Sequence, residues 1–216
     1  MDSKLLNKNM IEGQIKPIGG IKKNILEAFN SIDRIDFVPQ SFKKSSYSEK
    51  NLFIKRDRFV LKANLIARII SALSISSEEN VLVIGSSTGY TSAIISKLAE
   101  TVISIEEDQD LLDFSEEALR KNGIDNIVII NNSMIEGCSE QGPFNAIIIE
   151  GAVDEVPLKI LNQLDDDGRL IAMISDNGIC NVIEYKKRNK SFTNRFLFSC
   201  TAPKLRCFDK RKSFSF

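Results

Sequence analysis

Two glycines and one glutamate have the residue types and the spacing that nucleoside binding requires. Gly85 and Gly89 belong to the turn GSSTGY at residues 85–90, which directly follows the apolar run at 81–84. Glycine lets a backbone turn tightly or approach a ligand closely. Glu106 closes a second apolar run about 20 residues after Gly85. At that offset, an acidic residue reaches the ribose hydroxyls of a nucleoside lying over a glycine-rich first turn.

Both features also have ordinary structural interpretations. The turn could be a common connection between a strand and a helix. Glu106, Glu107 and Asp108 could simply enrich the start of a helix, where acidic residues are favourable. Ser87 stands where a pyrophosphate-binding turn has its second glycine, and a side chain there would crowd a pyrophosphate. A nucleoside cofactor without a pyrophosphate, such as S-adenosylmethionine, therefore fits this turn better.

The chain contains no histidine among its 216 residues. This composition excludes a histidine-based catalytic triad, a histidine-ligated zinc ion and a histidine proton shuttle. Any chemistry must use carboxylates, hydroxyls, thiols, amines or a bound cofactor. We expect no metal site.

The global composition gives no sign of a nucleic-acid or membrane partner. Lys plus Arg number 29, and so do Asp plus Glu, so no net charge favours nucleic acid or an anionic membrane. The apolar runs are far shorter than the roughly 20 residues that cross a membrane, and no secretory signal follows the first residues. The four cysteines form no C-x-x-C pair, which favours reduced thiols. We therefore expect a cytoplasmic protein; the sequence does not indicate its oligomeric state.

From residue 81 onward, predicted strands and helices alternate as they do in parallel sheets. The predicted strands cover residues 81–84, 101–105, 127–130, 146–149 and 169–174, and the predicted helices cover 91–99, 109–121, about 135–140 and 155–163. Continuously apolar runs such as 146–149 are typical of strands that are covered on both faces. The pattern predicts an α/β fold with a doubly wound, mostly parallel sheet.

The two ends of the chain do not continue this alternation of strands and helices. Residues 1 to about 55 are predicted to be mainly helical, with a short extended piece at 52–54, and another helix is expected at 59–73. A basic turn at 186–190 predicts an antiparallel hairpin at the edge of the sheet. The basic and aromatic tail at 204–216 could be a solvated edge or a nucleic-acid patch.

We interpret the chain as one domain, residues 1–216. Its expected parts are an N-terminal helical cap (1–75), a cofactor-binding α/β core (76–180) and C-terminal edge strands (181–216).

Several stretches, in the right order, resemble the protein-L-isoaspartate O-methyltransferase family, which has the class I S-adenosylmethionine-dependent fold. The resemblance extends over roughly residues 10 to 175, with matching stretches at 10–15, 32–39, 81–90, 105–106, 122–127, 144–152 and 156–171. It implies a Rossmann-like core that binds S-adenosylmethionine and methylates isoaspartyl carboxylates in damaged proteins. Such a carboxylate, with a pKa of about 3.9, is already ionised at neutral pH and needs no general base. That chemistry suits a chain without histidine.

The resemblance also implies a set of cofactor contacts. The matching positions are Gly85, Ser86, Ser87, Gly89, Tyr90, Glu106, Asn132 and Ser133. Asn132 and Ser133 stand where the family usually has an aspartate that meets the adenine amino group; either side chain could accept a hydrogen bond. Val83 stands where the family's first strand usually has an acidic residue.

The substrate loop departs most from the family pattern. The family's "G-Q-T-I-S" loop corresponds here to DRFVL at residues 57–61, so Leu61 replaces the serine. Leucine cannot hydrogen-bond the acceptor carboxylate, but Arg56, Arg58 or Lys62 could hold it instead. These cations could also be solvated charges at a helix start. Two alternatives therefore stay open: a diverged methyltransferase with another acceptor, and a non-catalytic relative that only binds a partner.

Overall fold

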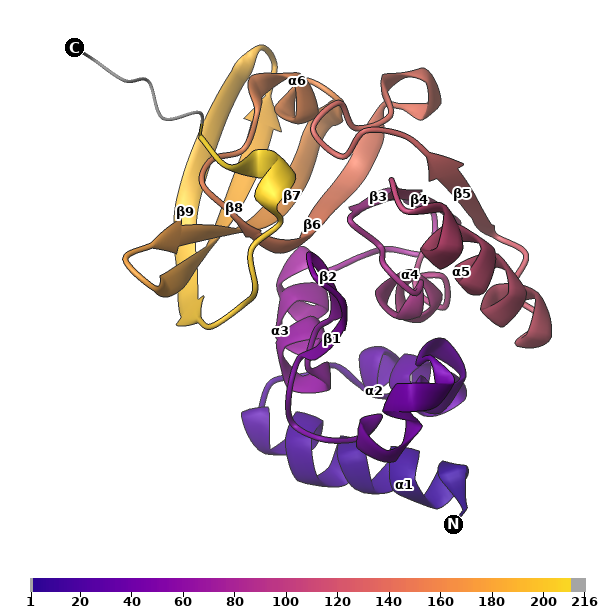
Figure 1. Cartoon of the computed structure of the whole chain (residues 1–216). Coiled ribbons are helices and arrows are strands. Elements are labelled where there is room, and N and C mark those ends of the chain that lie inside the picture. The colour runs from indigo at the N-terminus through magenta and orange to yellow at the C-terminus, as the bar shows by residue number, and fades with distance from the viewer. Residues whose placement is uncertain (1, 211–216) are drawn as a thin grey trace.

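The computed structural model describes residues 2–210, and a seven-stranded sheet forms its centre (Figure 1). The strand order is β5-β4-β3-β6-β7-β8-β9, with β3 to β7 parallel and β8 and β9 antiparallel. The bounds are β3 (Asn80–Ile84), β4 (Thr101–Glu106), β5 (Ile127–Asn131), β6 (Phe144–Val153), β7 (Leu164–Asp176), β8 (Ile179–Arg188) and β9 (Ser191–Cys200). The predicted doubly wound, mostly parallel sheet is confirmed.

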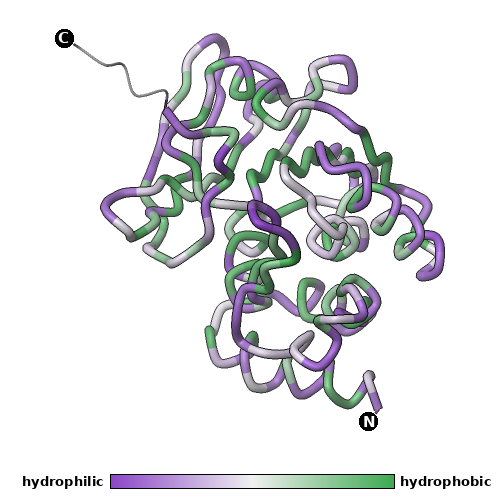
Figure 2. Tube along the Cα trace, viewed as in Figure 1, coloured by the Kyte–Doolittle hydropathy of each residue, from purple (hydrophilic) through white to green (hydrophobic). Residues whose placement is uncertain are grey.

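The central strands are continuously apolar because both faces of the sheet are covered. In β3, all four residues from Val81 to Ile84 are fully buried, and the trace through this region is mostly hydrophobic (Figure 2). In register, Val81 pairs with Val102 on one side and with Ala146 on the other. β3 therefore lies between β4 and β6, and the parallel strands open their carboxyl ends toward the same edge of the sheet.

The helices that flank this sheet are α3 (Ala63–Leu73), α4 (Tyr90–Ile95), α5 (Gln109–Lys121) and α6 (Leu158–Leu161). Asp108 caps the N-terminus of α5, where its side chain accepts a hydrogen bond from the backbone N–H of Leu111. The acidic cluster after β4 thus does serve a helix start, but only through Asp108.

Two expected helices differ from the structure. The helix predicted at 59–73 begins only at Ala63, because β2 (Arg58–Val60) pairs with β1 (Leu52–Lys55) in a separate two-stranded sheet. The helix predicted near 135–140 is wrong: the segment forms turns and one 3-10 turn, η5 (Ser139–Gln141). Gly137 explains the difference, since it has a left-handed φ of 68° and a Cβ there would lie 2.4 Å from Oε1 of Gln163.

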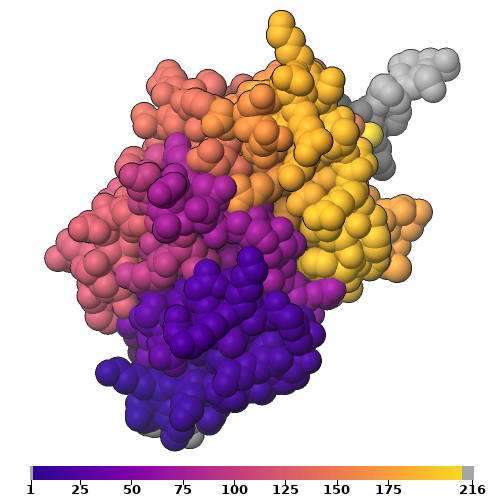
Figure 3. Space-filling view, turned by 180° about the vertical axis from the view of Figure 1, so that it is seen from behind, coloured from indigo at the N-terminus to yellow at the C-terminus, as the bar shows by residue number. Residues whose placement is uncertain are grey.

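The N-terminal segments form one end of the molecule, seen in indigo in Figures 1 and 3. They comprise α1 (Ser3–Met10), the π-helical η1 (Ile11–Ile15), α2 (Lys23–Ser31) and the 3-10 segments η2 (Lys16–Ile18), η3 (Arg34–Phe37) and η4 (Gln40–Ser45). Their apolar residues belong to the same hydrophobic core as the sheet. No helix within residues 2–210 is long and apolar enough to cross a membrane.

The C-terminal strands form the predicted hairpin, and the chain after β9 then turns back over the sheet. The backbone N–H of Ala152 in β6 donates to the carbonyl of Pro203, and the N–H of Leu205 donates to the carbonyl of Ala152. Leu205 and Phe208, which lies in η6 (Arg206–Phe208), are buried. The two apolar residues of this part of the tail therefore pack inward, whereas Arg206, Asp209 and Lys210 are exposed, as expected of a solvated edge; residues 211–216 lie outside the described residues.

Candidate functional site

The turn after β3 adopts three left-handed backbone conformations. Gly85 has φ 79°, Ser87 has φ 50° and Gly89 has φ 83°. Left-handed conformations favour glycine, so the two glycines follow from the geometry, whereas Ser87 takes up a conformation that side chains rarely adopt. The backbone N–H groups of Gly85 and Ser86 both donate to the carbonyl of Ile105, which fixes the turn against the end of β4.

Glu106 lies at the end of β4 with its side chain fully buried against this turn. Its Oε2 accepts a hydrogen bond from the backbone N–H of Ser87 at 3.1 Å. Its Oε1 accepts from the N–H groups of Glu107 at 2.8 Å and Asp108 at 3.0 Å. The structure therefore brings Glu106 and the glycine turn together, as the sequence spacing predicts.

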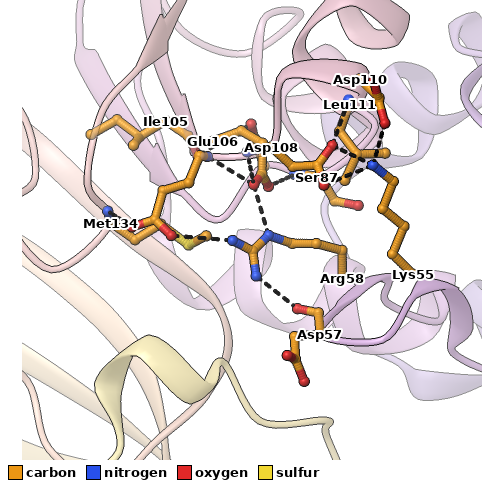
Figure 4. Close-up of polar contacts among 12 residues, drawn as sticks. Lys55, Asp57, Arg58, Ser87, Ile105, Glu106, Asp108, Asp110, Leu111 and Met134 are labelled. Atoms are coloured by element: carbon orange, nitrogen blue, oxygen red, sulfur yellow. Dashed lines mark hydrogen bonds and ion pairs between the residues drawn. The ribbon is translucent and has the colours of Figure 1, made fainter.

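A fourth donor reaches Glu106 from the β1–β2 hairpin (residues 52–60). Nε of Arg58 lies 2.7 Å from Oε1 of Glu106 (Figure 4). A terminal nitrogen of the same guanidinium lies 3.3 Å from Oε2 of Glu107. Burial lowers the pKa of Arg58, but its hydrogen bond to Glu106 and that residue's charge outweigh burial and raise it. Arg58 is therefore not a solvated charge at a helix start, because it pairs with Glu106 and Glu107; its role toward an acceptor carboxylate stays a prediction.

The same hairpin is fastened to the start of α5. Nζ of Lys55 lies 2.6 Å from Oδ1 of Asp108 and 2.7 Å from Oδ2 of Asp110, and Figure 4 shows the lysine reaching both carboxylates. Lys55 and Arg58 flank the two-residue turn of the hairpin. Two cations from one hairpin therefore contact the acidic segment that follows β4.

Leu205 occupies the space beside the glycine turn. A Cβ at Gly85 would lie 3.1 Å from Cδ1 of Leu205 and 3.3 Å from the sulfur of Met134. A Cβ at Gly151 in β6 would lie only 2.5 Å from Cγ of Leu205. In this arrangement, Gly85 and Gly151 make room for a leucine. Sequence reasoning missed Leu205, because an apolar residue in a basic tail gives no signal of where it packs.

A second buried glutamate lies on the other side of β3. Glu150 in β6 accepts a hydrogen bond at 2.5 Å from the hydroxyl of Thr91, while its Oε2 has no partner within residues 2–210. Burial raises the pKa of Glu150 to about 8, although Thr91 and the charge of Arg34 oppose the increase. Sequence reasoning did not single out this carboxyl group.

The remaining predicted site residues are less closely grouped. The amide of Asn132 donates to the carbonyl of Gly137 and accepts from the N–H of Ser133, so this side chain organises its own loop. Leu61 is fully buried, and its carbonyl accepts a hydrogen bond from Arg34. Arg56 is exposed at the hairpin turn.

Lys62 lies apart from the Arg58 contact. It lines an open cavity of about 710 Å³ together with Arg68 and Cys200. Lys62 is part of the predicted acceptor loop, so this cavity borders that loop.

Comparisons with known proteins agree with this arrangement. The family described as protein-L-isoaspartate(D-aspartate) O-methyltransferase matches residues 5–201. The chain belongs to this family. A protein-L-isoaspartate O-methyltransferase from Methanospirillum hungatei is 29% identical over 198 residues, which are 91% of this chain and 92% of the relative. Another, from Myxococcus xanthus, is 32% identical over 160 residues, which are 74% of this chain and 76% of the relative.

A solved structure shows the same fold. It is a Plasmodium falciparum protein described as a protein-L-isoaspartate O-methyltransferase in complex with S-adenosyl-L-homocysteine. Its TM-score is 0.80 at 21% identity, and the match covers 95% of this chain and 98% of that one. The family and fold inferred from the sequence are therefore confirmed, and with them the S-adenosylmethionine-dependent methyltransferase class.

The residues around the turn after β3 are of the kinds that could hold the family's cofactor. Glu106 supplies a carboxylate at the end of the second core strand, next to the backbone of Ser87. The hydroxyls of Ser87 and Thr88 are buried and have no hydrogen-bond partner within the described chain, so this turn holds polar groups available to a ligand. Glu106 itself, however, is engaged by Arg58, and Leu205 lies over Gly85.

Proposed function

We propose that this chain transfers a methyl group from S-adenosylmethionine to the isoaspartyl carboxylate of damaged proteins. The observation that carries the proposal is the buried carboxylate of Glu106, which lies at hydrogen-bond distance from the backbone N–H of Ser87 in the glycine turn. A carboxylate in this position is suited to accept the ribose hydroxyls of a nucleoside, and the family match supports the reaction.

In this proposal, the turn at 85–90 and Glu106 hold the nucleoside part of the cofactor. When bound, S-adenosylmethionine supplies a methyl group on a positively charged sulfur. The acceptor carboxylate is ionised at neutral pH and can attack without a general base, which agrees with the absence of histidine. The chain then has to bind both reactants, align them and exclude water.

The acceptor side depends on residues near the hairpin. Leu61 cannot hold a carboxylate, and Arg58 is occupied by Glu106 in the described state. Lys62 lines an open cavity beside Arg68, and neither cation forms an ion pair within residues 2–210. We propose Lys62 as the cation that attracts the acceptor carboxylate, with the exposed Arg56 as a second candidate.

A second candidate function is a relative that binds the cofactor or a partner without catalysing repair. The absence of the loop serine at Leu61 and the contact between Arg58 and Glu106 favour it. A diverged methyltransferase with another acceptor is the intermediate case.

The test uses S-adenosylmethionine with a labelled methyl group and two peptides that differ only in one residue, isoaspartate or aspartate. The proposal expects label on the isoaspartyl peptide only. Label on neither peptide, with S-adenosylhomocysteine still bound in calorimetry, points to another acceptor or to a binding protein. No binding at millimolar ligand eliminates both methyltransferase hypotheses. A Lys62→Gln variant should raise KM for the peptide and leave cofactor binding unchanged.

We also propose a cytoplasmic location. All four cysteines are free thiols in the structure, including the cross-strand neighbours Cys180 and Cys200 in β8 and β9. Free thiols in such a pair agree with a reducing compartment.

A further inference from the structure

The carboxylate of Glu106 can accept both hydroxyls of a ribose only by giving up a present partner. Within residues 2–210, its Oε1 accepts three hydrogen bonds and its Oε2 accepts one. The side chain is fully buried. Three of the donors are backbone N–H groups of the turn and of the two residues that follow Glu106. Those groups are fixed by the fold. The fourth, the guanidinium of Arg58, is the only donor on a flexible side chain.

The hairpin that carries Arg58 is anchored in the hydrophobic core by Leu52, Phe59 and Val60, so its turn end, which carries Lys55 and Arg58, is the part that can shift. β1 and β2 pair only with each other, in a two-stranded sheet apart from the main one. An isolated two-stranded hairpin is marginally stable in water. This hairpin is held by side-chain contacts, among them Lys55 with Asp108 and Arg58 with Glu106.

The C-terminal segment packs against the same glycine turn. Leu205 packs against Gly85 and Gly151, and its backbone is tied to Ala152 of β6. The neighbouring Arg206 lies 3.0 Å from Asp57, in the turn of the β1–β2 hairpin. The hairpin and the C-terminal segment are therefore connected above the cofactor turn.

We infer that Arg58 competes with the cofactor's ribose for Glu106, so that both ribose hydroxyls bind only when a shift of the hairpin's turn end has moved Arg58 away and Leu205 has left Gly85. The inference rests on the proposed function, since it takes S-adenosylmethionine as the ligand. Arg58 is then a positioning residue that sets cofactor affinity. The described structure is the closed state.

The competition has a quantitative consequence. A ligand that binds only an open state has its dissociation constant raised by the inverse of the open fraction. Removing Arg58 frees the carboxylate and increases that fraction. The Arg58→Gln variant should therefore bind S-adenosylhomocysteine at least about tenfold more tightly than the unaltered chain.

Calorimetric titration with S-adenosylhomocysteine measures this difference. The matched control is Arg195→Gln, which makes the same substitution in an arginine that pairs at 2.6 Å with another buried glutamate, Glu184, in the C-terminal hairpin. Its dissociation constant should equal that of the unaltered chain. Leu205→Ala should also tighten binding, by a smaller factor.

Nuclear magnetic resonance of the unaltered protein gives a second test, which does not depend on whether Arg58→Gln folds. The Nε–H of Arg58 should be protected from exchange in the free protein and should lose that protection, with a shifted signal, at saturating S-adenosylhomocysteine.

Each outcome decides between the two hypotheses. Tighter binding by Arg58→Gln, or loss of the protected signal, supports the competition. Equal affinities for Arg58→Gln and the unaltered chain, with an unchanged Arg58 signal, overturn it and leave the proposed function standing. No binding to any variant, with the Arg58 signal unaffected by ligand, overturns both.

Discussion

The turn after β3 has a buried glutamate on either side, and the two are stabilised in opposite ways. Glu106 at the end of β4 accepts hydrogen bonds from three backbone N–H groups and from the cationic Arg58. Within residues 2–210, Glu150 in β6 accepts one hydrogen bond, from Thr91, and its Oε2 has no partner. Burial raises the pKa of Glu150 to about 8. Glu106 is therefore surrounded by donors, whereas Glu150 lies in surroundings that favour its proton.

This difference shows on which side of β3 the fold stabilises an ionised carboxylate. A buried carboxylate needs donors or a proton, because an unpaired buried charge is very costly. On the β4 side, the fold supplies donors that keep Glu106 ionised. The oxygens of this carboxylate can therefore accept hydrogen bonds from ribose hydroxyls when a nucleoside binds. On the β6 side, burial raises the pKa of Glu150 to about 8, so the carboxyl group is mainly neutral at pH 7. We propose that the nucleoside binds on the β4 side for this reason.

Removing the carboxylate of Glu106 should have the largest effect. Glu106→Gln puts an amide among N–H donors and leaves the largely buried Arg58 without its main partner. We expect a loss of about 3 to 5 kcal/mol in unfolding free energy, as for other broken buried ion pairs. Urea denaturation measures it. The control is Glu107→Gln, which removes the weaker contact with Arg58 at 3.3 Å. A loss below about 1 kcal/mol for Glu106→Gln would show that these donors contribute little.

Glu150 should make stability depend on pH in the opposite direction from most carboxylates. Its pKa rises from 4.5 to about 8 on folding, so between these values the native state binds a proton that the unfolded state does not. Stability should therefore fall as pH rises through this window, by roughly 2 to 4 kcal/mol from Glu150. Glu150→Gln should remove that dependence. Parallel stability curves of the two proteins from pH 5 to pH 8.5 would contradict the assignment.

The comparison also shows why the sequence predicts that Glu106 lies beside the glycine turn but does not predict the other partners of these residues. The positions of Gly85 and Glu106 follow from the lengths of β3, α4 and β4, which apolar periodicity reveals. The backbone then brings both to the same edge of the sheet, whatever the other side chains do.

The partners of these residues depend on long-range contacts that no local pattern encodes. Arg58 is 48 residues away from Glu106 in the chain and belongs to a separate small sheet. From the sequence alone, its charge could therefore also be interpreted as a solvated surface group. Leu205 reaches Gly85 from the C-terminal segment. Glu150 follows the apolar run at 146–149, and its local sequence gives no sign that it is buried. Its lack of donors becomes visible only once the atoms around it are known.

A third carboxylate, Glu79, tests whether an ion pair that only stabilises the fold behaves differently from the pair between Arg58 and Glu106. Glu79, just before β3, forms two hydrogen bonds of 2.6 and 2.7 Å with the guanidinium of Arg169. Burial raises the pKa of Glu79, but its hydrogen bonds outweigh burial and lower it, so its contribution should be lost as pH falls below 4.5. Glu79→Gln should cost about 1 to 2 kcal/mol in urea denaturation at neutral pH. Affinity for S-adenosylhomocysteine should not change; if it does, the two ends of β3 are coupled.

The contact of Lys55 with Asp108 and Asp110 should have the smallest effect on stability. Both partners are at least partly exposed, and ion pairs of this kind contribute little in water because solvent screens them. We expect Lys55→Met to leave the melting temperature almost unchanged, as should the control Lys16→Met, which removes an exposed pair with Glu12. The variants should differ in ligand binding. Lys55→Met frees the hairpin that carries Arg58, so calorimetry should show S-adenosylhomocysteine binding slightly more tightly, whereas Lys16→Met should bind as the unaltered chain does. Weaker binding by Lys55→Met would mean that the hairpin must stay docked on α5 to hold the cofactor, and the closed arrangement around Glu106 would then be part of the binding site.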